Sequence, residues 1–118
     1  MATFAKKLLS GSTDGVGILV SSISGGTAGT AGTIHSAVAG SSDYDEVWLW
    51  AFNGHTADVV LSLEWGTSAN PRVVTVPFKS GLVPIVPGLP INNGQKIQAF
   101  ADTTAVIVID GFVNKITN

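Results

Sequence analysis

The residues of this 118-residue chain that could act as acids, bases, nucleophiles or metal ligands are few and scattered. His35 and His55 are the side chains that titrate near neutral pH, and no third ligand is patterned around either. There is no cysteine, which excludes disulfides and thiolate metal sites. No serine occupies the centre of a Gly-x-Ser-x-Gly nucleophile elbow. We therefore expect no enzyme activity, no cofactor and no metal.

An acidic cluster is the closest approach to a cation site. Asp43, Asp45 and Glu46 surround Tyr44 just before a strand. Calcium loops place oxygen ligands at alternating positions and usually add a glycine and a terminal bidentate acid. Because this stretch has only the first part of that pattern, a solvated acidic loop is favoured over a cation site.

The composition is poor in charge. Charged residues make up 12% of the chain and the mean hydropathy is +0.40, whereas globular domains carry about 25% charged residues. The net charge of −2 gives no basic field for nucleic acid. Lys6 and Lys7 precede too short an apolar run for a secretory signal, and no run is long enough for a membrane helix. We expect a soluble chain whose surface is largely covered by other protein.

Alternating apolar residues and regularly spaced turn residues predict an all-β fold. A single-domain antiparallel β-sandwich or jelly roll of about eight strands is expected over residues 15–118, after a short N-terminal arm at 1–14. The expected strands are 16–23, 33–39, 46–52, 58–65, 72–78, 82–86, 96–101 and 105–113. The pair 46–52 and 58–65, joined through Asn53–Gly54, is predicted to form a hairpin.

The strand 46–52 carries the strongest functional signal. Val47, Leu49 and Ala51 point to one face, and the aromatic residues Trp48, Trp50 and Phe52 point to the other. Such a strand is either covered on both sides or presents its aromatic face to another subunit. The alternative is that the aromatic side chains fill the core and the aliphatic face meets solvent.

Three other segments complete the candidate contact residues. Pro84 and Pro87, with Pro90, predict an edge strand or an extended crossover, because proline cannot donate to a ladder. The closing strand 105–113 is apolar on both faces, and a bulge is expected at its Asp110–Gly111 step.

The first ten residues are expected to be a frayed end or an arm that docks on a neighbouring subunit. The arm has a short helix over Thr3–Leu9 and uses Phe4, Leu8 and Leu9 for contact. The Gly-Thr-Ala tract at 25–33 is predicted to be a flexible loop, or a place where another chain approaches closely.

Four stretches resemble small virion structural proteins of tailed bacteriophages, most of all the β-rich decoration (cement) proteins of the capsid. They are Glu46-Val47-Trp48-Leu49-Trp50-Ala51-Phe52-Asn53-Gly54, Leu63-Glu64-Trp65-Gly66, Val86-Pro87-Gly88-Leu89-Pro90 and Asp110-Gly111-Phe112-Val113-Asn114. The resemblance covers about residues 44–117. It implies a β-sandwich or jelly roll, a homotrimer, an arm that reaches neighbouring capsomers, and the major capsid protein as partner.

The resemblance also implies a location on the capsid surface of a virion made in the host cytoplasm. Two rival functions remain open. The first is another virion component, such as a head-fibre base, tail or adaptor protein. The second is a carbohydrate-binding β-sandwich module that stacks sugars on Trp48, Trp50 or Trp65. Nucleic acid, membrane and small-molecule ligands are not expected.

Overall fold

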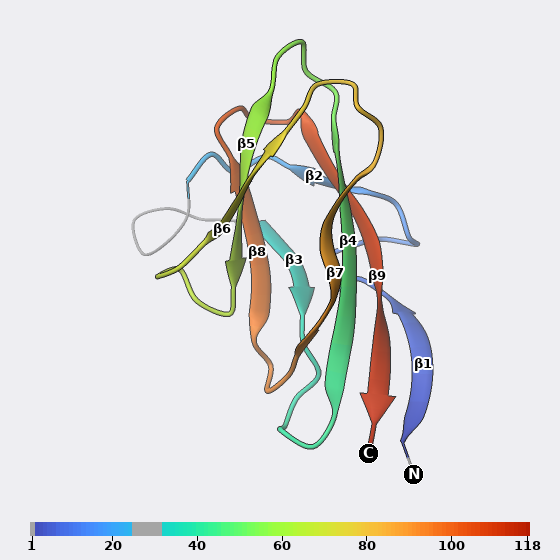
Figure 1. Ribbon diagram of the computed structural model, residues 1–118. Coiled ribbons are helices and arrows are strands. Elements are labelled where there is room, and N and C mark those ends of the chain that lie inside the picture. The colour runs from blue at the N-terminus through green and yellow to red at the C-terminus, as the bar shows by residue number, and fades with distance from the viewer. Residues whose placement is uncertain (1, 25–31) are drawn as a thin grey trace.

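The computed structural model describes residues 2–24 and 32–118, which form nine β-strands and no helix (Figure 1). The strands are β1 (Thr3–Leu8), β2 (Ile18–Val20), β3 (Gly32–Ser36), β4 (Tyr44–Asn53), β5 (Val59–Trp65), β6 (Arg72–Val76), β7 (Val83–Ile91), β8 (Lys96–Ala101) and β9 (Ile107–Thr117). In these ranges there is accordingly no helix long and apolar enough to cross a membrane. The predicted all-β fold is confirmed.

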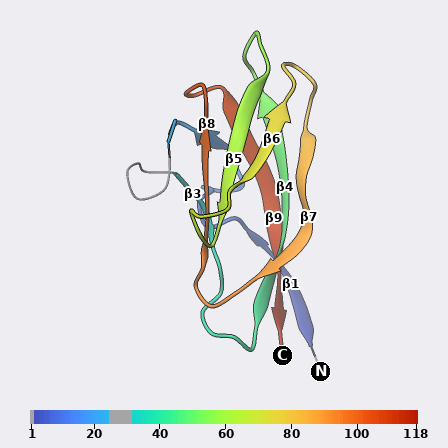
Figure 2. The ribbon, with the colours of Figure 1, turned by 60° about the vertical axis from the view of Figure 1, so that its left-hand side comes forward.

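The strands form two antiparallel sheets packed as layers (Figure 2). Sheet A has five strands in the order β1-β9-β4-β7, with β2 also pairing with β9, and sheet B has four in the order β3-β8-β5-β6. β1 and β2 share one edge of β9, β1 along its C-terminal half and β2 along its N-terminal part. From β2 to β9, every connection except β5–β6 crosses between the sheets, which is the strand order of a jelly roll.

The core lies between the sheets because alternate strand residues are apolar. Val47, Leu49 and Ala51 of β4 are fully buried, as are Ile107 and Ile109 of β9. Sheet B contributes alternate residues of β5 and β8 to the same cluster. The aliphatic face of β4 therefore points inward, and the alternative in which the aromatic residues fill the core is wrong.

The predicted N-terminal helix is also wrong, because Thr3–Leu8 is a strand paired with β9. A segment this short is not stable as a helix by itself, whereas β9 offers it an open edge for backbone hydrogen bonds. All six residues of β1 are exposed, so the strand adds nothing to the core. The chain then turns inward at Leu9, which is buried.

The predicted hairpin of β4 and β5 does not form, because the two strands belong to different sheets. Asn53 directs the crossing: its side-chain amide donates to the carbonyl oxygens of Ala57 and Val76, and its Oδ1 accepts the backbone N–H of His55. Asn53 is fully buried. These hydrogen bonds hold residues 54–58 as an arch between the sheets.

β7 is an edge strand of sheet A, as its prolines predicted, and it contains two register shifts against β4. By contrast, β9 pairs with β4 without a register shift through Asp110 and Gly111, so the bulge predicted there is absent. Gly111 is needed for a different reason: a Cβ there would lie 2.1 Å from the carbonyl oxygen of Trp48. Most of the Gly-Thr-Ala tract, residues 25–31, lies outside the described residues.

Candidate functional site

The outward side of sheet A is apolar across its width. Residues directly opposite one another in antiparallel strands share a face. Trp48 is opposite Phe112 on β9 and Pro87 on β7. Extending this register defines the outer face of sheet A as Phe4, Lys6, Leu8, Leu19, Tyr44, Glu46, Trp48, Trp50, Phe52, Pro84, Pro87, Pro90, Val108, Asp110, Phe112, Asn114 and Ile116. Apart from Lys6, Glu46, Asp110 and Asn114, every member is apolar or aromatic.

A stack of aromatic rings occupies the centre of this face. The ring of Phe112 lies 6.4 Å from that of Trp48 and 6.1 Å from that of Trp50, with interplanar angles of 16° and 27°. Trp48 also lies against the backbone of Gly88, where a Cβ would approach the indole to 2.7 Å. Stacking of this kind holds the rings in fixed positions and leaves them half-buried.

Two charged side chains are ordered by the same rings. The Lys6 ammonium lies 4.5 Å from the centre of the Phe112 ring, a cation–π contact. A carboxylate oxygen of Glu46 accepts hydrogen bonds from the indole N–H of Trp48 at 2.9 Å and the side-chain amide of Asn114 at 3.1 Å. These bonds, the first from Trp48 and the second from Asn114, lower the pKa of Glu46 from its ordinary value of 4.5.

Most of the candidate contact residues predicted from the sequence share this face. They are Phe4, Leu8, Trp48, Trp50, Phe52, Pro84 and Pro87. The side chains of Phe4 and Leu8 are 70% and 56% exposed. Leu9 is not part of the group, because it is buried in the core. The strands β1, β4 and β7 are distant in the sequence, and the fold brings their candidate contact residues onto one surface.

Sequence reasoning missed the β9 and β2 contributions to the face. Phe112 connects the two tryptophan rings, and Leu19, which is opposite Val108, is 51% exposed. The signal was present in the alternation of Val108, Asp110 and Phe112. It was lost because the Asp110–Gly111 step was interpreted as a bulge, which would have placed Phe112 on the other face.

The acidic cluster is not a solvated loop, because each of its three carboxylates is hydrogen-bonded to another part of the chain. Asp45 is buried, and its Oδ2 lies 2.7 Å from Nε2 of the buried His35. The other ring nitrogen of His35 accepts the backbone N–H of Ser10, so Nε2 carries the proton that Asp45 accepts. Asp43 instead accepts the backbone N–H of Asn118, and Glu46 points to the outer face. No group of three metal-ligating side chains occurs in residues 2–24 and 32–118.

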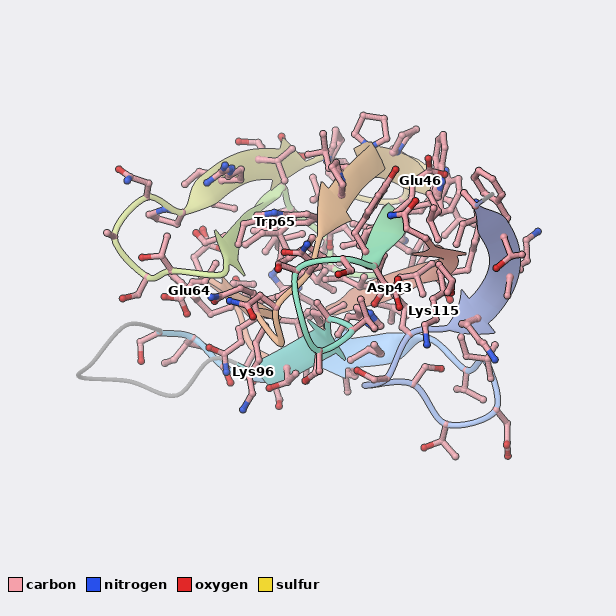
Figure 3. The ribbon with its side chains drawn as sticks, turned by 90° about the horizontal axis from the view of Figure 1, so that it is seen from below. Asp43, Glu46, Glu64, Trp65, Lys96 and Lys115 are labelled. Carbon is pink, nitrogen blue, oxygen red and sulfur yellow. The ribbon has the colours of Figure 1, made fainter. Side chains whose placement is uncertain are left out.

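Sheet B presents a more polar surface. Glu64, Lys96 and Gln98 help to line a pocket of about 390 Å³ where β5 ends and β8 begins. Viewed along the strands, Glu64 and Lys96 lie on the side of the molecule away from Glu46, and Trp65 lies toward the interior (Figure 3). Trp65 packs against the core cluster. The two tryptophans with outward rings are therefore both on sheet A.

Comparison with known proteins adds no relative: no family model, curated protein or solved structure matches this chain.

Proposed function

We propose that this protein is a structural subunit of a virion, a decoration (cement) protein that binds the assembled phage head and stabilises it. The observation that carries the proposal is the outer face of sheet A. Burying exposed apolar surface is the main favourable contribution to protein association, and large aromatic residues are enriched at the centres of interfaces. A face of this composition is typical of a surface that another chain covers.

The arrangement of the resembling stretches supports the same proposal. Residues 86–90 of β7 and 110–114 of β9 flank β4, which carries most of 46–54, so three of the four stretches that resemble virion proteins lie together in sheet A. The jelly roll adds an analogy at the level of the fold, since viral capsid proteins use it, although lectins and cupins do as well.

The mechanism is mass action. A protein that binds the assembled shell and not its separated subunits shifts the equilibrium toward the shell, by an amount that grows with its free concentration relative to the dissociation constant. The partner is the major capsid protein. No chemical step is required of the subunit, and its rigidity comes from the packed core between two sheets.

The carbohydrate-binding alternative is less favoured by the geometry of the rings. A sugar stacks on an open aromatic face. Trp48 lies against the backbone of Gly88 and stacks with Phe112, and Trp65 packs against the core. Only Trp50 remains as a platform, and it too stacks with Phe112.

Localisation in purified particles tests the proposal. Particles from the culture that carries the gene are analysed by quantitative mass spectrometry and cryo-electron microscopy. A decoration protein is present in hundreds of copies on the outside of the shell, and its removal lowers the temperature at which the shell opens. A few copies at the tail would support the other virion role, and absence from particles would refute both.

A further inference from the structure

We propose that the outer face of sheet A pairs with the same face of a second copy, related by a two-fold axis parallel to the strands. This inference rests on the proposed function: the chain that covers this face is a second copy of the same subunit, and the pair binds the major capsid protein through its remaining surface. A two-fold axis between β9 and β4 places β4 opposite β9 of the other copy and β1 opposite β7. Rotation about this axis leaves the position of each residue along the strand direction unchanged. A row of residues that are directly opposite one another across sheet A therefore meets the same row of the other copy in reverse order.

One row of directly opposed residues brings the exposed Phe4 side chain to a pocket on the other copy. Phe4 is opposite Ile116, which is opposite Tyr44, and the row ends on β7 near Ile91. At that end of the row a pocket of about 360 Å³ is lined by Tyr44, Pro90, Ile91 and Asn92. Phe4 is 70% exposed at the other end. The two-fold axis carries the Phe4 ring of each copy to the pocket of the other.

The neighbouring row brings opposite charges together. Lys6 is opposite Asn114, Asn114 is opposite Glu46, and Glu46 is opposite Pro90. The same axis therefore places Lys6 over the Pro90 position of the other copy, beside Glu46. Within a single chain β9 separates Lys6 from Glu46. Both interactions occur twice in the pair, as an isologous contact requires.

The size of the face suits a stable pair. The width of the face is four strands at a spacing of about 4.8 Å, and its length is that of β4 at about 3.4 Å per residue. Their product is on the order of 650 Å² per copy, without the additional area of the protruding side chains. Specific interfaces bury roughly 800 Å² per partner. Two sheet faces can cover each other in one isologous contact, whereas a trimer needs two different complementary patches on each chain.

Both edges of sheet A favour face-to-face contact over edge-to-edge pairing. β7 carries Pro84, Pro87 and Pro90, which cannot donate to an added strand. β1 carries Lys6 and Lys7 on opposite faces, and charged side chains, lysine above all, are a common protection for an edge strand. Association by extending the sheet is thus disfavoured at each side.

A charge-exchange experiment tests the pairing. Sedimentation equilibrium of the full chain should give twice the 12.1 kDa chain mass. Lys6→Glu and Glu46→Lys each place like charges together twice in the pair, so each variant alone should dissociate at least tenfold more readily. Mixing the two variants restores both attractive contacts, and the mixture should recover the mass of a pair with wild-type affinity.

Two further variants separate the pairing from simple loss of folding. Phe4→Lys should give a folded single chain, because Phe4 is outside the core, while Val73→Lys, at a similarly exposed position on sheet B, should leave the pair intact. Circular dichroism checks the fold of each. A mass of three chains, or a mixture that fails to recover, overturns the pairing.

The outcomes also separate this inference from the proposed function. A single chain that still coats the shell would overturn the pairing alone. A paired protein that is absent from particles would overturn the function alone.

Discussion

Gly88 offers a direct test of how the aromatic face is held. Its φ is +78°, and a Cβ added to it would lie 2.7 Å from the Trp48 ring. Gly81 is a matched control, because its φ is +79° and a Cβ there would meet nothing within 4 Å. Gly88→Ala and Gly81→Ala therefore introduce the same backbone strain, and only the first displaces the indole.

The expected magnitudes follow from these contacts. A left-handed backbone costs an alanine about 1–2 kcal/mol, and the lower entropy of the unfolded alanine chain offsets roughly 0.4–1 kcal/mol of this. Gly81→Ala should thus lower the free energy of unfolding by about 1 kcal/mol. Moving Trp48 also weakens its stack with Phe112, worth about 0.5–1.5 kcal/mol. Gly88→Ala should therefore cost about 2 kcal/mol.

Urea unfolding measures both values, at protein concentrations low enough that association does not add to stability. The slope of the free energy against urea should be unchanged in both variants. Near-ultraviolet circular dichroism should change for Gly88→Ala alone, since only that variant moves a stacked tryptophan. If the two variants are equally destabilised, then the indole is not held against Gly88 and the stack is not a fixed feature of the face.

Three other expectations concern β4 and the residues just before it. Leu49→Ala should lower the free energy of unfolding by about 2–5 kcal/mol in urea melts, because the side chain is fully buried; a loss below about 1 kcal/mol would place that face outside the core. Asp45→Ala should cost about 1–3 kcal/mol by leaving a buried imidazole N–H without its acceptor, while Asp43→Ala, at an exposed hydrogen bond, should cost less than about 1 kcal/mol. The pKa of Glu46, followed by carbon NMR, should lie below 4.5 and rise toward it in Trp48→Phe, which lacks the indole donor. Since folding lowers that pKa, the contribution to stability is present above pH 4.5 and is lost as the pH falls through the lowered pKa; an unshifted titration would mean that the indole bond is absent.

The sequence predicted the strands well, because alternation and turn residues are local signals. Eight of the nine strands overlap the ranges expected from the sequence. Pairing was harder to predict. The hairpin through Asn53–Gly54 failed because the side chain of Asn53 bonds to Val76, which is distant in the sequence and belongs to the other sheet. The strand at Thr3–Leu8 was missed because its edge on β9 exists only after the sheet has formed.

The candidate site was predictable in composition and not in extent. The alternation of Trp48, Trp50 and Phe52 indicated an unusual outward face from sequence alone. Only the register of sheet A could add Phe112 and Leu19, which come from strands far away in the chain. The buried pair of His35 and Asp45 left no local pattern, since the two residues are ten positions apart and Asp45 belongs to an acidic run that looks solvated.

Quenching of tryptophan fluorescence by acrylamide tests directly whether protein covers the outer face of sheet A. Trp65→Phe removes the tryptophan that packs against the core, which leaves Trp48 and Trp50 as reporters on the face. We expect weak quenching at high protein concentration and markedly stronger quenching after dilution, with Phe4→Lys strongly quenched at every concentration. Strong quenching of the parent chain that does not change with concentration would contradict it.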